Sequence, residues 1–367
     1  MKILNVPGLG LLLPFFFMTI NTSQPDISRG QLSGQTPAES GKGHTLQLDR
    51  QTVLDSMQAV MGPLPERTEL KASDLQIRDS LVTDKYTRYL VTLKVADNEE
   101  TTCYLYIPVG AEEKKNVPAQ DKIAAMLVLH GTGNLGKRLV DGESPKENRA
   151  HAKELAERGY VVIAPDYPSM GEQLDYNFDT DRYQSGTMKA IVNHMRCVDL
   201  LQSLDFVDPE RIGVIGHSLG GHNAIFVAAF DTRLKVVVTS CGWTNMAYYN
   251  GEATADRIKP WAQKRYMPLI GDKYSTNGDD FPFDFDEVIA TLAPRAFFSN
   301  SPINDHNFDV EGVKAGMPLI SKAYKSANAF DQLQVRYPDA EHDFPPAVRF
   351  EAYAFIDQVL EHGNVVK

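Results

Sequence analysis

Short apolar runs recur along the chain from about residue 123, each followed by a longer stretch of mixed polarity. They consist mainly of Val, Ile, Leu, Ala and Phe, without the alternation of a strand that exposes one face to water. Strands of a parallel sheet are covered on both faces, so these runs predict buried parallel strands. The predicted strands are Ile123–Leu129, Tyr160–Ala164, Arg211–Ile215, Leu234–Thr239, Arg295–Ser299 and Leu333–Tyr337.

The stretches between these runs have the composition and length of helices. The predicted helices are Glu147–Arg158, Thr187–Ser203, Leu219–Phe230, Val310–Lys325 and Pro346–Leu360. Strand and helix thus alternate, which predicts an α/β fold with a doubly wound, mostly parallel sheet and right-handed crossovers.

Two features complete the predicted organisation. Upstream, Tyr86–Val95 and Thr101–Ile107 alternate apolar and polar residues, which predicts antiparallel strands. Residues 242–292 interrupt the alternation of strands and helices. They form an irregular, aromatic-rich insertion, which is predicted to be a small cap. No internal repeat and no second core is evident, so we predict one domain over residues 51–367.

The motif Gly216-His217-Ser218-Leu219-Gly220 lies directly between a predicted strand and a predicted helix. In that context Gly-x-Ser-x-Gly forms a sharp turn that exposes a serine hydroxyl at the sheet edge. The helix that begins there directs backbone N–H groups at the reacting centre. Ser218 is therefore the predicted nucleophile; the alternative is a structural tight turn.

A catalytic serine needs a base and an orienting acid, and both should follow strand ends. His342 comes after the last predicted strand and is the predicted base. Asp305 and Asp309 follow the strand Arg295–Ser299; Asp305 is preferred because Asp309 could equally cap the next helix.

The developing oxyanion needs backbone donors. We expect one from the N–H of Leu219 and a second from Gly131 or Thr132, in the glycine-rich loop after the first parallel strand. That loop matches no nucleotide-binding spacing, so no cofactor is expected. No metal is expected either, because His130, His306 and His342 lack the spacing of zinc motifs.

Three further residues are predicted to contact the substrate: His130, His217 and Trp243. For His217 the alternative is packing beneath the Ser218 turn. For Trp243 it is the core of the cap, although an aromatic cap could stack on a sugar ring or ester group.

Charge and cysteine content narrow the possible partners. The net charge of −11 argues against nucleic acid and anionic membrane surfaces. Three cysteines cannot all be paired, so we predict that they are small core residues. The alternative is a disulfide between Cys197 and Cys241. The oligomeric state is not determined by the sequence.

The N-terminal region has the composition of a targeting segment. One lysine precedes an apolar stretch too short for a good membrane span, so residues 1–23 are a predicted export signal and the protein is expected to be secreted or periplasmic. The alternative is a membrane anchor or a disordered tail. Residues 24–50, rich in Ser, Gly, Gln, Thr and Pro, are a predicted linker.

Several motifs in order resemble those of α/β-hydrolases, over roughly residues 85–362. The chain is most similar to the dienelactone-hydrolase-like and acetyl-xylan-esterase-like branch. The motifs are Leu129–Gly133, Ala164–Pro168 with Gly171-Glu172, Gly216–Gly221, Ala293–Arg295 and His342–Pro345, and Pro282–Glu287 is similar to a segment of secreted carbohydrate esterases, glucuronoyl esterases included.

The resemblance implies a Ser218–Asp305–His342 triad and an oxyanion site at Leu219 and His130–Thr132. Three positions depart from the relatives. The arginine of glucuronoyl esterases is missing after Ser218, the acid loop lacks Gly-x-x-Asp, and serine replaces the cysteine of dienelactone hydrolases.

The resulting hypothesis is a secreted serine hydrolase that cleaves a small-molecule or saccharide ester, such as a carbohydrate-linked acetyl ester. The alternatives are a prolyl-oligopeptidase-like peptidase and a non-catalytic binding protein of the same fold.

Overall fold

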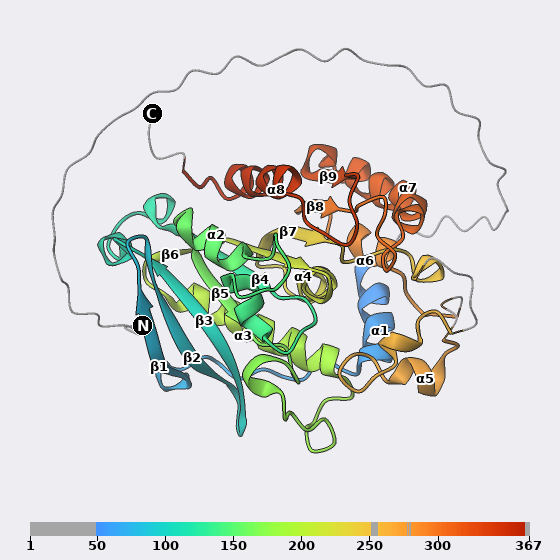
Figure 1. The fold of residues 1–367 in the computed structure, drawn as a ribbon, viewed down its shortest axis with the longest axis horizontal. Coiled ribbons are helices and arrows are strands. Elements are labelled where there is room, and N and C mark those ends of the chain that lie inside the picture. Colours follow the sequence, from blue (N-terminus) through green and yellow to red (C-terminus); the bar gives the residue numbers. More distant parts are fainter. Residues whose placement is uncertain (1–48, 251–255, 277, 279, 364–367) are drawn as a thin grey trace, which may run out of the picture. The chain divides into compact units, whose positions relative to one another are not determined.

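The structure is a computed structural model that describes residues 49–250, 256–276, 278 and 280–363 (Figure 1). The predicted export signal and nearly all of the predicted linker lie outside the described residues. Nine strands form one sheet in the order β1-β2-β3-β5-β4-β6-β7-β8-β9. The strands are β1 Leu75–Val82, β2 Tyr86–Ala96, β3 Glu99–Pro108, β4 Ile123–Leu129, β5 Val161–Pro165, β6 Val207–His217, β7 Leu234–Ser240, β8 Ala296–Asn300 and β9 Leu333–Arg336.

The pairing confirms the predicted fold class. Strands β1, β2, β3 and β5 pair antiparallel, whereas β5, β4, β6, β7, β8 and β9 pair parallel. Each of the six apolar runs contributes a parallel strand, and both predicted antiparallel segments are present.

Helices cover both faces of the sheet. They are α1 Arg50–Met61, α2 His151–Glu157, α3 Gly186–Ser203, α4 Leu219–Phe230, α5 Leu269–Lys273, α6 Phe285–Ala290, α7 Val310–Ser326 and α8 Pro346–Val359. One core cluster joins α2 and α8 to alternate strand residues such as Met126 and Val238. The intervening residues, such as Leu127 and Val237, are equally buried, and α3 and α4 pack against β6 on that face.

Two predicted boundaries are wrong. The linker was expected to reach residue 50, but Asp49 caps α1 by accepting from the backbone N–H of Thr52, and Arg50 is the first helical residue. Helix α2 begins at His151 rather than at Glu147. Asn148, with φ 60°, turns the backbone in the left-handed region, so residues 147–150 form a loop.

Between β7 and β8, the described part of the predicted insertion contains only short helical segments, among them α5 and α6. All three cysteines are buried free thiols. Cys197 lies beside Cys103, with 3.8 Å between the sulfur atoms, and the alternative Cys197–Cys241 disulfide is not formed. None of the described helices is long and apolar enough to cross a membrane.

Candidate active site

Ser218 occupies the turn between β6 and α4, with φ 57° and ψ −120°. L-residues rarely adopt this conformation, which aims the side chain away from the sheet. The turn is tight enough to require its glycines: a Cβ on Gly216 would lie 2.1 Å from the Gly220 carbonyl oxygen. The backbone N–H of Ser218 donates to the Ser240 carbonyl at 2.8 Å, which holds the turn against β7.

His342 and Asp305 are joined by a hydrogen bond of 2.9 Å between Nδ1 and Oδ2. The Asp305 carboxylate is buried, and its other oxygen accepts from the backbone N–H groups of Asn307 and Phe308. A carboxylate held in this way favours the imidazole tautomer with the proton on Nδ1, leaving Nε2 as a proton acceptor. Asp309 instead caps α7, accepting from the Glu311 N–H at 2.8 Å.

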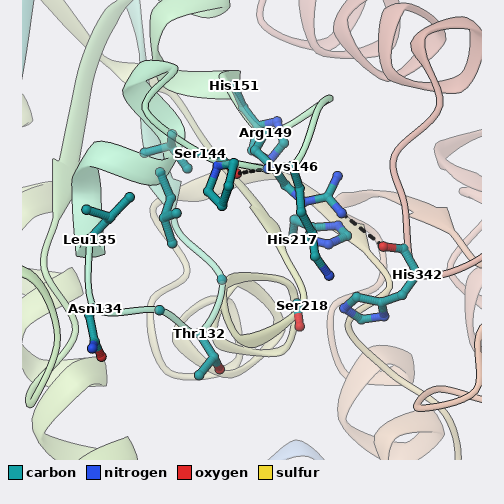
Figure 2. A pocket seen from close by; sticks show the side chains of 15 residues that line it. Thr132, Asn134, Leu135, Ser144, Lys146, Arg149, His151, His217, Ser218 and His342 are labelled. Atoms are coloured by element: carbon teal, nitrogen blue, oxygen red, sulfur yellow. Dashed lines mark hydrogen bonds between the residues drawn. The ribbon is translucent and has the colours of Figure 1, made fainter.

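Ser218 and His342 line the same cavity, of about 290 Å³ (Figure 2). The Ser218 hydroxyl forms no hydrogen bond to His342 among the described residues. In free hydrolases such bonds are often long and tighten only with substrate bound.

The loop after β4 supplies the wall opposite His342. A Cβ placed on Gly131 would lie 3.6 Å from Ser218 Cβ, so this loop runs close to Ser218. Thr132 also lines the cavity. Leu219 is the first residue of α4, where a backbone N–H has no partner within the helix.

His130 anchors that loop and does not line the cavity that contains Ser218 and His342. Its Nε2 accepts from the Tyr167 N–H at 3.0 Å, and its Nδ1 lies 2.7 Å from the Gly131 carbonyl. Burial lowers the pKa of His130, so the ring is neutral, and both ring nitrogens form hydrogen bonds with backbone groups. We therefore assign His130 to loop positioning instead of the predicted substrate contact.

His217 lies beneath Ser218 and lines the cavity, as predicted for one of its two roles. Its Nδ1 is 3.0 Å from Ser240 Oγ, and its ring centroid is 4.9 Å from that of His342. Burial, together with the charge of Arg149, holds the pKa of His217 far below its usual value, so this histidine is neutral.

Trp243 is not at the site. Its side chain is buried in the core, and its Nε1 donates to Ser299 Oγ at 2.8 Å. Ser218 also lines a second cavity, of about 260 Å³, whose lining includes the insertion residues Trp261, Tyr249 and Tyr266. We call this the aromatic cavity; it shares Thr132 and Ser218 with the first and also includes Leu219, His222 and Phe308.

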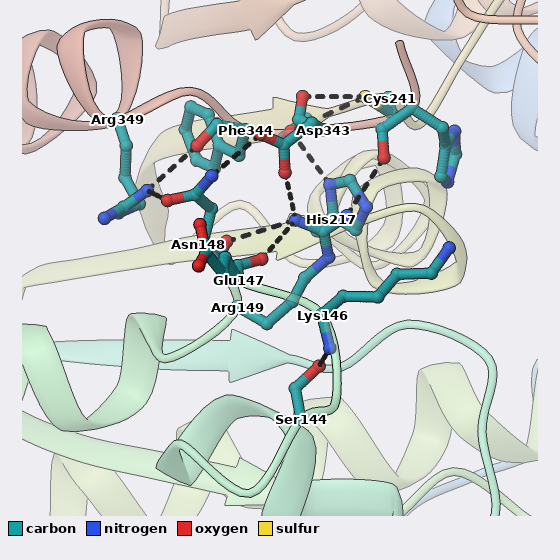
Figure 3. A network of polar contacts seen from close by, with 12 residues as sticks. Ser144, Lys146, Glu147, Asn148, Arg149, His217, Cys241, Asp343, Phe344 and Arg349 are labelled. Atoms are coloured by element: carbon teal, nitrogen blue, oxygen red, sulfur yellow. Dashed lines mark hydrogen bonds and ion pairs between the residues drawn. The ribbon is translucent and has the colours of Figure 1, made fainter.

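The first cavity contains charged residues that sequence reasoning did not single out: Lys146 and Arg149. We call it the cationic cavity. Arg149 donates to Asp343 Oδ1 at 2.5 Å and to the His342 carbonyl at 2.9 Å (Figure 3). Asn300 and Cys241 donate to the Asp343 carbonyl as well, so several bonds fix the backbone that carries His342.

A buried ion pair supports the far wall of the cationic cavity. Lys137 Nζ lies 2.6 Å from Asp166 Oδ2, and both side chains are almost fully buried. The same carboxylate accepts from the Lys137 N–H and from the Thr102 hydroxyl. Gly136 makes the approach possible, because a Cβ there would lie 2.1 Å from Asp166 Oδ1.

Cys241, Asp305 and His342 place one potential metal ligand atom each within 4.8 Å of one another. The group fits a metal poorly. The ligand atoms of Asp305 and His342 are hydrogen-bonded to each other, and burial raises the pKa of Cys241 well above its usual value, which keeps the thiol protonated.

Comparison with known proteins agrees with this architecture. The family model described as "Alpha/beta hydrolase family" matches residues 126–356. YtaP of Bacillus subtilis (strain 168), which carries the name of a hydrolase, is 25% identical over 313 residues, covering 82% of this chain and 96% of YtaP. Carbohydrate esterase MZ0003, from an unknown prokaryotic organism, is 27% identical over 164 residues, covering 41% of this chain and 37% of that protein.

Solved structures show the same fold. A glucuronoyl esterase from Solibacter usitatus superposes with a TM-score of 0.63 at 18% identity, covering 84% of this chain and 91% of that chain. A promiscuous CE15 esterase from a marine bacterial metagenome gives a TM-score of 0.59 at 17% identity, covering 85% of this chain and 90% of that chain. The family match spans the strands and helices that carry Ser218, Asp305 and His342, and the chain belongs to the alpha/beta hydrolase family.

Proposed function

We propose that this protein is a serine esterase that hydrolyses carboxylic esters through an acyl-enzyme. The observation that carries the proposal is the Asp305–His342 hydrogen bond beside the cavity that Ser218 lines. In this proposal Ser218 is the nucleophile, His342 the general base and Asp305 the residue that orients it. The family match and the names of the esterase relatives support the same reaction class.

The steps follow from the tautomer that Asp305 favours. His342 Nε2 accepts the Ser218 proton while Oγ attacks the ester carbonyl carbon. The N–H of Leu219 and an N–H of the Gly131–Thr132 loop stabilise the oxyanion. His342 then protonates the leaving alkoxide. A water molecule, deprotonated by His342, releases the carboxylic acid and restores Ser218.

A carbohydrate-linked ester is the substrate class that fits best. Trp261, Tyr249 and Tyr266 line the aromatic cavity beside the nucleophile, and flat rings of this kind stack on sugar rings. The apolar stretch in residues 1–23 supports export, which would bring the enzyme to extracellular polysaccharides. The names of the carbohydrate esterase relatives point the same way.

The test is the Ser218→Ala variant assayed on p-nitrophenyl acetate. We expect kcat to fall by about 10⁴-fold or more, as for other serine hydrolases that lose their nucleophile. Ser326→Ala, an exposed serine at the end of α7, is the matched control and should keep full activity.

A fluorophosphonate probe gives an independent readout. It should add one adduct to the wild-type protein, mapped to Ser218, and none to Ser218→Ala. Full activity in Ser218→Ala would refute the assignment of Ser218 as the nucleophile. A wild-type protein that the probe does not label would favour a non-catalytic binding protein. Acetylated oligosaccharides, methyl uronates and Pro-containing peptides would then distinguish the substrate classes.

A further inference from the structure

The charge of the cationic cavity is opposite to that of the whole chain. The protein has a net charge of −11, yet the residues lining this cavity include Lys146 and Arg149 and no acidic residue. Ser218 and His342 lie in the same lining, so any group bound there is close to the reacting ester. A positive cavity in an acidic protein attracts anions selectively.

Lys146 is the cation available to a ligand. It is exposed, and its ammonium group forms no ion pair with a described residue; its backbone N–H donates to Ser144 Oγ at 3.1 Å. In Figure 2 the side chain extends past His217 toward the Ser218 end of the cavity. Its charge is also one of those that lower the pKa of His217.

Arg149 has a different role. Its terminal N–H groups are used by Asp343 Oδ1 and by the carbonyls of Glu147 and His342. The Asp343 carboxylate balances its charge, so Arg149 is a positioning residue for the His342 loop, whereas Lys146 is free to balance a charge on the substrate.

A second observation points to a polar ligand in this cavity. His151 lines it and is fully buried, and neither of its ring nitrogens has a hydrogen-bond partner among the described residues. Burial lowers the pKa of His151 to about 3, so the ring is neutral and carries one N–H donor. A buried polar group without a partner is costly unless a ligand or water satisfies it.

We propose that the cationic cavity binds a carboxylate carried by the ester substrate, with the Lys146 ammonium as its counter-ion. Leu135, Leu139 and Val140 form an apolar wall for the carbons between that carboxylate and the scissile ester. This inference rests on the proposed esterase function and specifies its substrate as an anionic ester.

The test compares esters that differ only in charge. Mono-p-nitrophenyl glutarate and p-nitrophenyl valerate place the carboxylate or a neutral chain on the acyl side. Acetyl esters of a hydroxy acid and of the corresponding alcohol place it on the alcohol side. The readout is the ratio of kcat/KM for the anionic and neutral ester of each pair.

In the wild-type enzyme we expect the ratio to favour the anionic ester in one of the two pairs. Lys146→Gln should lower that ratio by about five- to tenfold, which is less than a buried charge-assisted hydrogen bond would give because Lys146 is exposed to solvent. Lys146→Glu should lower it further, and raised ionic strength should reduce it in the wild type. Lys322→Gln removes the same charge from the exposed face of α7 and should leave the ratio unchanged.

Two results would overturn the proposal: a wild-type enzyme without preference for the anionic ester in either pair, or the same ratio in Lys146→Gln and in the wild type. Both presuppose turnover that depends on Ser218. Persistent turnover in Ser218→Ala would contradict the esterase mechanism instead, so the two failures are distinguishable.

Discussion

The cationic and the aromatic cavity meet at Ser218, but different physical interactions build them. The cationic cavity is lined mainly by residues 131–151, between β4 and α2, and its shape depends on ion pairs. The aromatic cavity is lined largely by the β7–β8 insertion and by the loop after β8. Its rings pack edge to face, with 5.4 Å between the centroids of Tyr249 and Trp261.

In the proposed mechanism, this difference allows one serine to select both ends of an ester substrate. The Arg149–Asp343 ion pair fixes the loop of His342, while the Lys146 ammonium has no ion-pair partner among the described residues, which suits recognition of a substrate charge. Packed aromatic rings present a flat apolar surface, which suits recognition by shape. If the two cavities act separately, changes on one side should leave the selectivity of the other side intact.

The largest effect is expected from removing the buried cation behind the cationic cavity. Lys137→Met leaves the Asp166 carboxylate buried without its counter-ion, which should lower the free energy of unfolding by about 3–5 kcal/mol. Urea denaturation measures this loss. Lys137→Met combined with Asp166→Asn should recover part of the stability, since no buried charge then remains.

Lys235→Met is the matched control. Lys235 pairs with Glu210 at the surface, where side-chain exposures are 37% and 73%, so its loss should cost about 1 kcal/mol or less. Equal costs for the two lysine variants would contradict the role of the Lys137–Asp166 pair.

A pH-dependent effect is expected next, at helix α6, whose Phe285 ring centroid lies 6.0 Å from that of Trp261 in the aromatic cavity. Asp284 caps α6 and accepts from the backbone N–H groups of Phe285 and Met246. Burial raises the pKa of Asp284 to about 7 from its usual value of 3.8. The folded state therefore retains this proton to a higher pH than the unfolded chain, and stability falls as pH rises from about 4 to 7.

Asp284→Asn should remove this dependence, because asparagine is uncharged and caps helices equally well. Its stability relative to wild type should increase between pH 4 and 7, by about 4 kcal/mol at most, since one pKa unit is worth about 1.4 kcal/mol. Thermal unfolding at several pH values measures the trend. Asp49→Asn should show the opposite trend, because hydrogen bonds from Thr52 lower the pKa of Asp49.

The smallest effect is expected from the aromatic wall itself. Tyr266→Ala removes a half-buried ring from the aromatic cavity and should raise KM for an acetylated oligosaccharide by about five- to tenfold. Tyr266→Phe keeps the ring and should stay within about twofold of wild type. A change in preference between anionic and neutral esters in Tyr266→Ala would show that the two cavities are not independent.

The sequence predicts the sheet and the residues that follow its strands, because those signals are local. Strands covered on both faces must be apolar throughout, and the turn at Ser218 needs glycine at fixed positions. Asp305 and His342 could be selected because strand order in this fold determines where their loops meet. Helix α1 also had a readable signal: Asp49 precedes apolar residues with helical spacing.

The walls of the two cavities could not be predicted in this way. Arg149 lies where a helix was expected, and Lys146 directly precedes that predicted helix. The loop that carries both residues is held by the Arg149–Asp343 pair, which joins residues almost 200 positions apart. Trp243 and Trp261 lie in the same irregular insertion. What separates them is a buried partner for the indole of Trp243 on β8, Ser299, and no periodicity reveals that contact.

The backbone at Ser218 has a consequence for how this protein can adapt to heat. A serine at φ 57° gives up roughly 1–3 kcal/mol that glycine would retain. In the proposed mechanism the Ser218 hydroxyl attacks the ester, so replacing this residue with glycine would increase stability and abolish turnover. Higher thermal stability must therefore come from substitutions remote from this turn, so stability and catalysis can change independently in separate parts of the polypeptide.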